Sequence, residues 1–180
     1  MTADTDPSRR LFYALWPVEP ERTRLVADFA PAIATAAGRP VPPANLHVTL
    51  AFLGLVPERR VAALRVLGAS LVWTPVMLVF DRLDWWATAQ AWVAGLRAPP
   101  PALLEYQASL ETGLRAGGLR MDQKPYLPHL TLARKVRAAP SESPPIRVSW
   151  RPSEVALVES IAAPGGSRYV PLERWPSGSA

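Results

Sequence analysis

The chain has 180 residues, of which 49% are hydrophobic and 19% charged, which fits one folded domain with a sizeable core and excludes a wholly disordered protein. It has no cysteine, which excludes disulfides, thiolate metal sites and thiol nucleophiles. Carboxylates are sparse around its two histidines, so we expect chemistry without a metal or other cofactor.

Twenty basic residues against 15 acidic ones give a net charge of +5, and all but Lys124 and Lys135 of the basic residues are arginines, which allows an anionic partner. No apolar stretch reaches the roughly 18 residues of a membrane-spanning helix. The first ten residues lack the apolar core of a secretory signal. We therefore expect a cytoplasmic monomer that does not enter a membrane.

Proline clusters separate short segments of regular pattern along the chain. In chain order the patterns predict a strand at 10–16, a helix at about 20–37, a strand at 46–54, a helix opened by Pro57, strands at 76–83 and 91–96 paired through 84–90, a helix at about 101–116, and strands at 129–136, 146–150, 154–161 and 168–175. Gly165-Gly166 is a turn signal before the last strand. Because strands and helices do not alternate strictly, an α+β fold with antiparallel sheets is favoured over a doubly wound parallel sheet.

Two short motifs are the most informative feature of the sequence. The only histidines stand in Leu46-His47-Val48-Thr49-Leu50-Ala51 and Pro128-His129-Leu130-Thr131-Leu132-Ala133, and 129 minus 47 places them 82 residues apart. Side chains alternate along a strand, so each motif presents an imidazole and a hydroxyl on one face, with apolar residues on the other. A single His-x-Thr carries little meaning, but two copies that use both histidines indicate a duplicated site.

Displacement at phosphorus uses such a set of groups. Attack and departure occur roughly in line on opposite sides of the phosphorus, so one imidazole can act as base and the other as acid. Histidine suits both roles because its ordinary pKa lies near 6.5. The hydroxyls can donate hydrogen bonds to the non-bridging oxygens. The symmetry of the motifs leaves open which ring is acid and which is base.

The motifs and their surroundings resemble the bacterial RNA 2′,3′-cyclic phosphodiesterases of the two-histidine phosphoesterase superfamily, also called the 2′-5′ RNA ligase family. The similarity runs from Arg10-Leu11-Phe12 through Asn45 to Gly54, then Pro128 to Arg134, and on to Leu157 to Ser160 and Ser167 to Tyr169. The resemblance implies one bilobal α+β domain, with two pseudo-symmetric lobes of mainly antiparallel sheet flanked by helices around a cleft. We assign the first half to residues 10–96 and the second to 101–176.

The resemblance also implies hydrolysis of a 2′,3′-cyclic phosphate at an RNA end to a 2′-phosphomonoester. In that reaction His47 is the proton donor, His129 is the proton acceptor, and Thr49 and Thr131 bind the phosphate. The expected partner is an RNA or oligonucleotide with a cyclic phosphate end, such as a tRNA fragment, or a cyclic nucleotide. The residues of one sequence do not name the physiological RNA.

Three further residues are candidates for contacting the substrate. Arg134 follows the second motif, but strict alternation places its side chain with Leu130 and Leu132, away from His129. Tyr126 and Phe52 have aromatic faces that accept unpaired bases, although packing in the core or at its rim is the favoured interpretation for each. Lys135 falls in phase with His129 and reads as an exposed lysine at the end of a strand.

Two alternatives to hydrolysis remain open. The same site can form a 2′-5′ linkage when a ribose hydroxyl replaces water as the nucleophile. A non-catalytic RNA-binding or phosphate-binding module would instead bind with strong salt dependence and leave a cyclic nucleotide unchanged.

Overall fold

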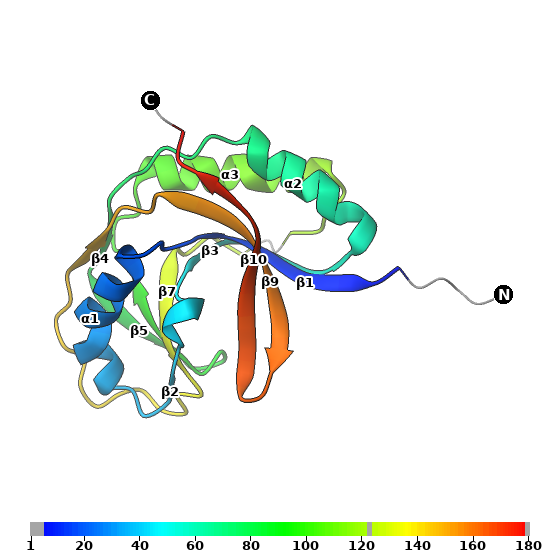
Figure 1. Cartoon of the computed structure of the whole chain (residues 1–180). Helices are drawn as coiled ribbons and strands as arrows, with labels where there is room; N and C mark the ends of the chain where they lie inside the picture. The colour runs from blue at the N-terminus through cyan, green and yellow to red at the C-terminus, as the bar shows by residue number, and fades with distance from the viewer. Residues whose placement is uncertain (1–5, 122–123, 179–180) are drawn as a thin grey trace.

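A computed structural model of the chain describes residues 6–121 and 124–178 and has an α+β fold whose described strand pairs are all antiparallel (Figure 1). The α+β expectation is therefore confirmed. Its helices are α1 (Glu21–Ala34), α2 (Val61–Ser70) and α3 (Pro101–Ala116), with short 3₁₀ turns at Pro43–Asn45 and Glu58–Arg60. Its strands are β1 (Ser8–Leu15), β2 (Arg39–Pro40), β3 (Val48–Pro57), β4 (Leu78–Phe80), β5 (Arg82–Trp86), β6 (Ala91–Gly95), β7 (His129–Arg134), β8 (Val148–Trp150), β9 (Glu154–Ala163) and β10 (Gly166–Pro176).

The main sheet joins two groups of strands at a narrow seam. Its order is β10-β9-β1-β3-β7-β6-β5, with β2 also paired to β7, while β4 and β8 form a separate small sheet. The seam between β3 and β7 is the single register pair Val48 and Leu130, whereas β1 and β3 pair over eight positions. The two motif strands therefore lie side by side at the middle of the sheet.

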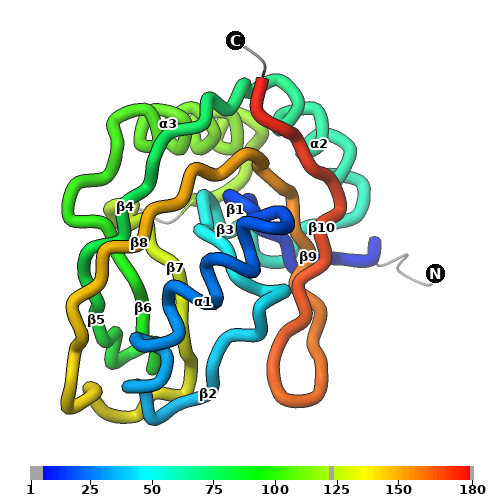
Figure 2. Tube along the Cα trace, turned by 60° about the vertical axis from the view of Figure 1, so that its left-hand side comes forward, coloured from blue at the N-terminus to red at the C-terminus, as the bar shows by residue number. Residues whose placement is uncertain are grey.

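Strands from the two halves of the chain are exchanged across this seam. β9 and β10, from the C-terminal half, extend the sheet beside β1, and β5 and β6, from the N-terminal half, extend it beside β7. Figure 2 shows the hairpin of β9 and β10 projecting beside β2, far from it in the sequence. The ranges 10–96 and 101–176 thus each contribute strands on both sides of the seam between β3 and β7.

One face of the sheet carries the main core. Leu11, Tyr13 and Leu15 of β1 pack there with buried residues of all three helices, in keeping with the apolar stripe that each helix shows in sequence. Phe12, Ala14 and Trp16 alternate with them and form a smaller cluster on the opposite face. Val48 and Leu130 belong to the main core, so the histidine and threonine on either side of each of them face the opposite side of the sheet.

The segment expected as one strand at 76–83 differs from the prediction. Asp81 interrupts it, because β4 pairs with β8 and β5 pairs with β6. Strand β5 also continues through Asp84 to Trp86, whereas the sequence pattern places these residues in the connection at 84–90. Only 87–90 form the turn. The turn expected near Gly165-Gly166 is confirmed, at Pro164 and Gly165. No helix in the described ranges is long and apolar enough to cross a membrane.

Candidate active site

The register of the seam brings the four motif side chains onto one face. Because Val48 pairs with Leu130 in an antiparallel ladder, His47 falls opposite Thr131, and Thr49 falls opposite His129. Directly opposed residues are about 5 Å apart, and diagonal neighbours are about 7–8 Å apart. His47 and His129 are such diagonal neighbours, and the two rings are close enough to interact electrostatically.

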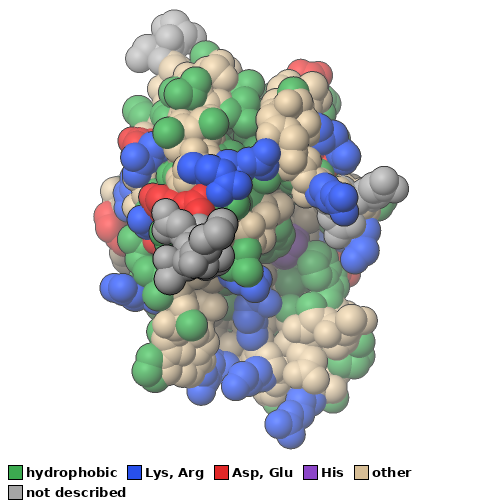
Figure 3. All heavy atoms as spheres, turned by 90° about the vertical axis from the view of Figure 1, so that its right-hand side faces the viewer, with side chains coloured by type: hydrophobic (Ala, Val, Ile, Leu, Met, Phe, Trp, Pro, Cys, Tyr) green, Lys and Arg blue, Asp and Glu red, His purple; other side chains and the backbone are tan. Residues whose placement is uncertain are grey.

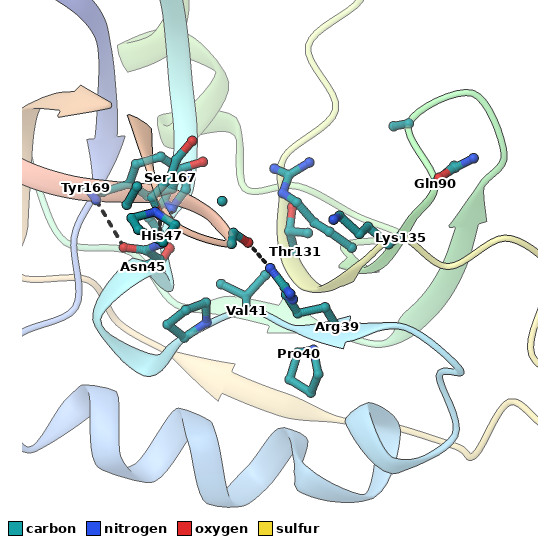
Figure 4. Close-up of a pocket in the computed structure, with 17 residues that line it drawn as sticks. Arg39, Pro40, Val41, Asn45, His47, Gln90, Thr131, Lys135, Ser167 and Tyr169 are labelled. Carbon is teal, nitrogen blue, oxygen red and sulfur yellow. Dashed lines mark hydrogen bonds between the residues drawn. The ribbon is translucent and has the colours of Figure 1, made fainter. Parts of the chain in front are cut away.

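The four motif side chains line two hollows, and each hollow contains the histidine of one motif and the threonine of the other. The hollow that we call the cationic pocket has a volume of about 340 Å³ and is lined by His47, Thr131 and three cationic side chains, which are Arg39, Arg134 and Lys135 (Figure 4). The second, which we call the aromatic pocket, has a volume of about 550 Å³ and is lined by Thr49 and His129 with Phe52, Trp86 and Tyr126. Figure 3 shows a histidine in a hollow of the surface with Lys and Arg side chains around it.

Both imidazoles are oriented in the same way by the backbone. Nδ1 of His47 donates to the carbonyl oxygen of Asn45 at 2.6 Å, and Nδ1 of His129 donates to the carbonyl oxygen of Leu127 at 2.7 Å. A carbonyl only accepts, so Nδ1 carries the hydrogen in each ring and Nε2 remains as the proton-exchanging atom. In His47 that Nε2 accepts a hydrogen bond from the Thr49 hydroxyl at 3.0 Å.

The surroundings of the two rings differ. His47 stacks on Trp16, with ring centroids 5.9 Å apart, and packs against Phe12 at 4.9 Å and the edge of Tyr169 at 5.2 Å. Burial, together with the charges of His129 and Arg134, lowers the pKa of His47 to about 4. His129 packs against Trp86 at 4.3 Å, and burial lowers its pKa from the ordinary value as well. Both shifts favour the neutral form of the ring at pH 7.

Arg134 lies on the same face as His47 and Thr131, so the expectation from strict alternation was wrong. Trp92 pairs with Ala133 and Val93 pairs with Thr131, so Leu132 is an extra residue in β7. Leu132 and Ala133 are consequently both buried in the core, and the bulge returns Arg134 to the side of Thr131. The guanidinium lines the cationic pocket, close enough for its charge to lower the pKa of both histidines.

The two aromatic candidates occupy different positions in the aromatic pocket. The hydroxyl of Tyr126 donates to the carbonyl oxygen of Thr49 at 3.1 Å, and burial raises the pKa of Tyr126. The ring thereby holds the first motif strand in place. Phe52 is 65% exposed, and its ring lies 5.9 Å from Phe12 at the edge of the same pocket.

Comparisons with known proteins identify the family of this chain. A family described as LigT-like phosphoesterase matches residues 15–90. The chain is 33% identical over 168 residues to the RNA 2′,3′-cyclic phosphodiesterase of Escherichia coli (strain K12), a match that covers 93% of this chain and 96% of that protein. The chain belongs to the LigT-like phosphoesterase family.

Other relatives agree with this assignment. An RNA 2′,3′-cyclic phosphodiesterase of Thermus thermophilus is 32% identical over 182 residues, covering 92% of this chain and 89% of that protein. The crystal structure of E. coli LigT complexed with 3′-AMP superposes with a TM-score of 0.83 at 31% identity, covering 96% of this chain and 99% of that chain. The similarity to the LigT-like family therefore extends over nearly the whole fold.

Our sequence reasoning missed the part that Asn45 plays in this LigT-like site. Its side chain is 7% exposed, with Nδ2 donating to the carbonyl oxygen of Ser167 at 2.7 Å and Oδ1 accepting from the backbone N–H of Tyr169 at 3.2 Å. Asn45 thus ties strand β10 to the backbone that orients His47. The only signal in the sequence was a short amide in an otherwise apolar stretch, whose burial requires partners.

Sequence reasoning also passed over Arg39, and it left Lys135 as an exposed lysine at the end of a strand. Both line the cationic pocket, because β2 pairs with the end of β7. Within the described ranges, no three His, Asp or Glu side chains come together in a way that could hold a metal ion.

Proposed function

We propose that the protein hydrolyses RNA ends that carry a 2′,3′-cyclic phosphate, leaving a 2′-phosphomonoester, with His47 as the general acid and His129 as the general base. The observation that carries the proposal is the diagonal placement of the two imidazoles across the Val48 and Leu130 pair. The names of the E. coli and T. thermophilus relatives support the same reaction. A cytoplasmic location and a monomeric state belong to the proposal.

The reaction is an in-line displacement at one phosphorus atom. Nε2 of His129 accepts a proton from water, the water oxygen bonds to phosphorus, and the bond from phosphorus to O3′ breaks. Nε2 of His47 gives a proton to O3′, and the phosphate stays on O2′. His47 ends neutral and His129 protonated, and proton exchange with solvent restores the starting state.

Binding of the substrate favours the protonated form of His47 that a general acid requires. An anionic phosphate beside Nε2 favours the protonated ring and so raises the lowered pKa of His47. Once protonated, Nε2 no longer accepts the hydrogen bond from Thr49. The Thr49 hydroxyl is then released to donate to a phosphate oxygen, so that protonation of the acid and binding of the phosphate support one another.

Arg134 and Thr131 complete the phosphate-binding group. The guanidinium charge that lowers the pKa of both histidines also attracts the non-bridging oxygens, where negative charge increases during the displacement. Thr131 lines the same pocket as Arg134 and lies opposite His47. Hydrogen bonds from both sides hold the phosphate between the two rings.

The test uses adenosine 2′,3′-cyclic phosphate, with 2′-AMP as the expected product. His47→Ala and His129→Ala should each lower kcat by at least about a hundredfold, the usual contribution of general acid–base catalysis. Arg151→Ala, an exposed residue that lines neither pocket, is the control and should keep full activity. Full turnover by either histidine variant, a 3′-AMP product, or binding without conversion as in a simple RNA-binding module would each overturn the proposal.

Ligation through a 2′-5′ linkage is the second candidate, and the aromatic pocket favours it. His129 opens into about 550 Å³ with the exposed ring of Phe52 at its edge, which is more space than a water molecule needs. A nucleoside stacked there would offer its ribose hydroxyl to phosphorus in place of water. RNA halves carrying a cyclic phosphate and a free 5′-hydroxyl should then give a joined product, which Phe52→Ala reduces.

A further inference from the structure

The cationic pocket continues beyond the residues that the reaction uses. Arg39 pairs with Arg134 across β2 and β7, which places their Cα atoms about 5 Å apart, and Lys135 follows Arg134 along the chain. The described residues that line this pocket include no carboxylate to neutralise these three cations. The aromatic pocket, in contrast, contains both Glu111 and Lys124. The cationic pocket is therefore suited to more negative charge than a single phosphate brings.

The backbone at this end of the pocket has an unusual conformation. Lys135 has a φ of 58° and Gln90 a φ of 48°, and these are the only described residues other than glycine with positive φ. Both line the cationic pocket, and the N–H of Val136 donates to the carbonyl oxygen of Gln90 at 2.9 Å. A lysine in this region is disfavoured relative to glycine or asparagine, and such residues concentrate at functional sites. In Figure 4 the Lys135 side chain lies beside Thr131.

Arg39 is held toward the pocket from the opposite side. Its guanidinium donates a hydrogen bond to the carbonyl oxygen of Gly165 in the turn between β9 and β10 (Figure 4). Gly165 has a φ of 87°, and a Cβ atom there would come within 2.8 Å of the guanidinium. The close approach of this glycine turn fixes the direction of Arg39, whose remaining N–H groups are available to a ligand.

The proposed reaction determines on which side the RNA lies. O3′ leaves toward His47, so the ribose and the chain attached to it occupy the cationic pocket, and the water approaches from the aromatic pocket. Thr131 and Arg134 pair with Val93 and Ala91, which are two residues apart in β6, so they lie about 7 Å apart along the sheet, a length comparable with one nucleotide. The cations thus lie where the preceding phosphate of an RNA chain would reach.

We infer that Arg39 and Lys135 bind the phosphodiester immediately upstream of the cyclic phosphate. The inference rests on the proposed function and adds a substrate preference to it, for the end of an RNA chain over a free cyclic mononucleotide. Arg39 offers a planar fork that matches phosphate oxygens, and Lys135 adds a point charge. Specificity for the chain then comes from its backbone charge and requires no particular base.

The test compares three substrates. They are adenosine 2′,3′-cyclic phosphate, the ApA dinucleotide with a 2′,3′-cyclic phosphate end, and the same dinucleotide with a neutral methylphosphonate in place of its internal phosphodiester. The charged dinucleotide should show kcat/KM about tenfold above each of the other two, the effect of one net charge-assisted hydrogen bond. Its KM should also rise more steeply with salt.

Variants then locate the contact. Arg39→Gln and Lys135→Gln should each lower the ratio of kcat/KM between the charged and neutral dinucleotides by about threefold or more. Lys135→Gln keeps the hydrogen bond between Arg39 and Gly165, so a lower ratio in this variant cannot come from a displaced turn between β9 and β10. Arg151→Gln removes an equal charge at an exposed position outside both pockets and should leave the ratio unchanged.

The outcomes distinguish this inference from the proposed function. Turnover of all three substrates with equal kcat/KM overturns the inference and leaves the proposed hydrolysis intact. If the methylphosphonate dinucleotide keeps the higher kcat/KM over the cyclic mononucleotide, the preference comes from the added nucleoside, and the inference about Arg39 and Lys135 is overturned. An unchanged ratio in both glutamine variants has the same consequence. Absence of turnover on every substrate overturns the proposed function and the inference with it.

Discussion

Acidification should destabilise the protein through His47 when no anion is added. The unfolded chain protonates this ring near pH 6.5, whereas burial lowers the pKa to about 4 in the folded state. Between these values the unfolded state binds more protons than the folded state, so the free energy of unfolding falls as the pH falls. A difference of 2.5 pKa units at 1.36 kcal/mol each gives a loss of about 3 kcal/mol. The ring of His47 is partly accessible to solvent, so about 3 kcal/mol is the upper limit of the loss.

The comparison that isolates this effect is between the wild-type protein and His47→Gln. Urea unfolding followed by tryptophan fluorescence at pH 7 and pH 4 gives the free energy of unfolding of each protein. Carboxylates titrate in both proteins and cancel in the difference, which should change by up to about 3 kcal/mol in favour of the variant on acidification. Saturating inorganic phosphate should reduce this change, because the anion supports the protonated ring. Parallel pH dependence of the two proteins would refute our reasoning about His47.

Three further predictions concern the same site. Arg134→Gln should lower kcat on adenosine 2′,3′-cyclic phosphate by about a hundredfold, the scale of losing one group that stabilises transition-state charge, and a rate within threefold of wild type would contradict its role. Turnover should persist after dialysis against EDTA, because side chains supply the acid, the base and the charge, and loss restored by a divalent cation would argue against this chemistry. Asn45→Ala should reduce the free energy of unfolding by about 1–3 kcal/mol, because the backbone of Ser167 and Tyr169 loses its hydrogen bonds to the buried amide. The exposed control Thr112→Ala should cost less than about 0.5 kcal/mol, and equal losses would contradict the role of Asn45 in holding β10.

Local patterns were sufficient to predict the two motif strands. His47-Val48-Thr49-Leu50 and His129-Leu130-Thr131-Leu132 alternate polar and apolar residues, and that period by itself separates a core face from an open face. The structure buries Val48 and Leu130 in the main core, as the alternation requires. Which strands become neighbours depends on contacts distant in sequence, so the pairing of β9 with β1 was outside the reach of a local pattern.

The two clearest departures from the prediction have the same physical origin. The bulge at Leu132 exists because β7 and β6 pair out of step, and it reverses the face expected for Arg134. The division of 76–83 arises because β4 finds β8 as its partner while β5 folds back on β6. In both cases the deciding hydrogen bonds are made to another segment. Periodicity within one segment carries no information about them.

The structure shows a difference between the surroundings of the two histidines that the symmetric motifs lack. Each imidazole donates from Nδ1 to the carbonyl two residues before it, so the local geometry of the two rings is equivalent. Their pockets are not equivalent, because the described residues on the side of His47 include three cations and no carboxylate, whereas Trp86 and Phe52 line the side of His129. A polyanionic RNA chain is attracted to the first side and a small neutral nucleophile is accommodated on the second. The leaving oxygen remains attached to the chain, so in the proposed reaction the ring on the cationic side, His47, is the one placed to protonate it, which agrees with the order of roles that the family resemblance implies.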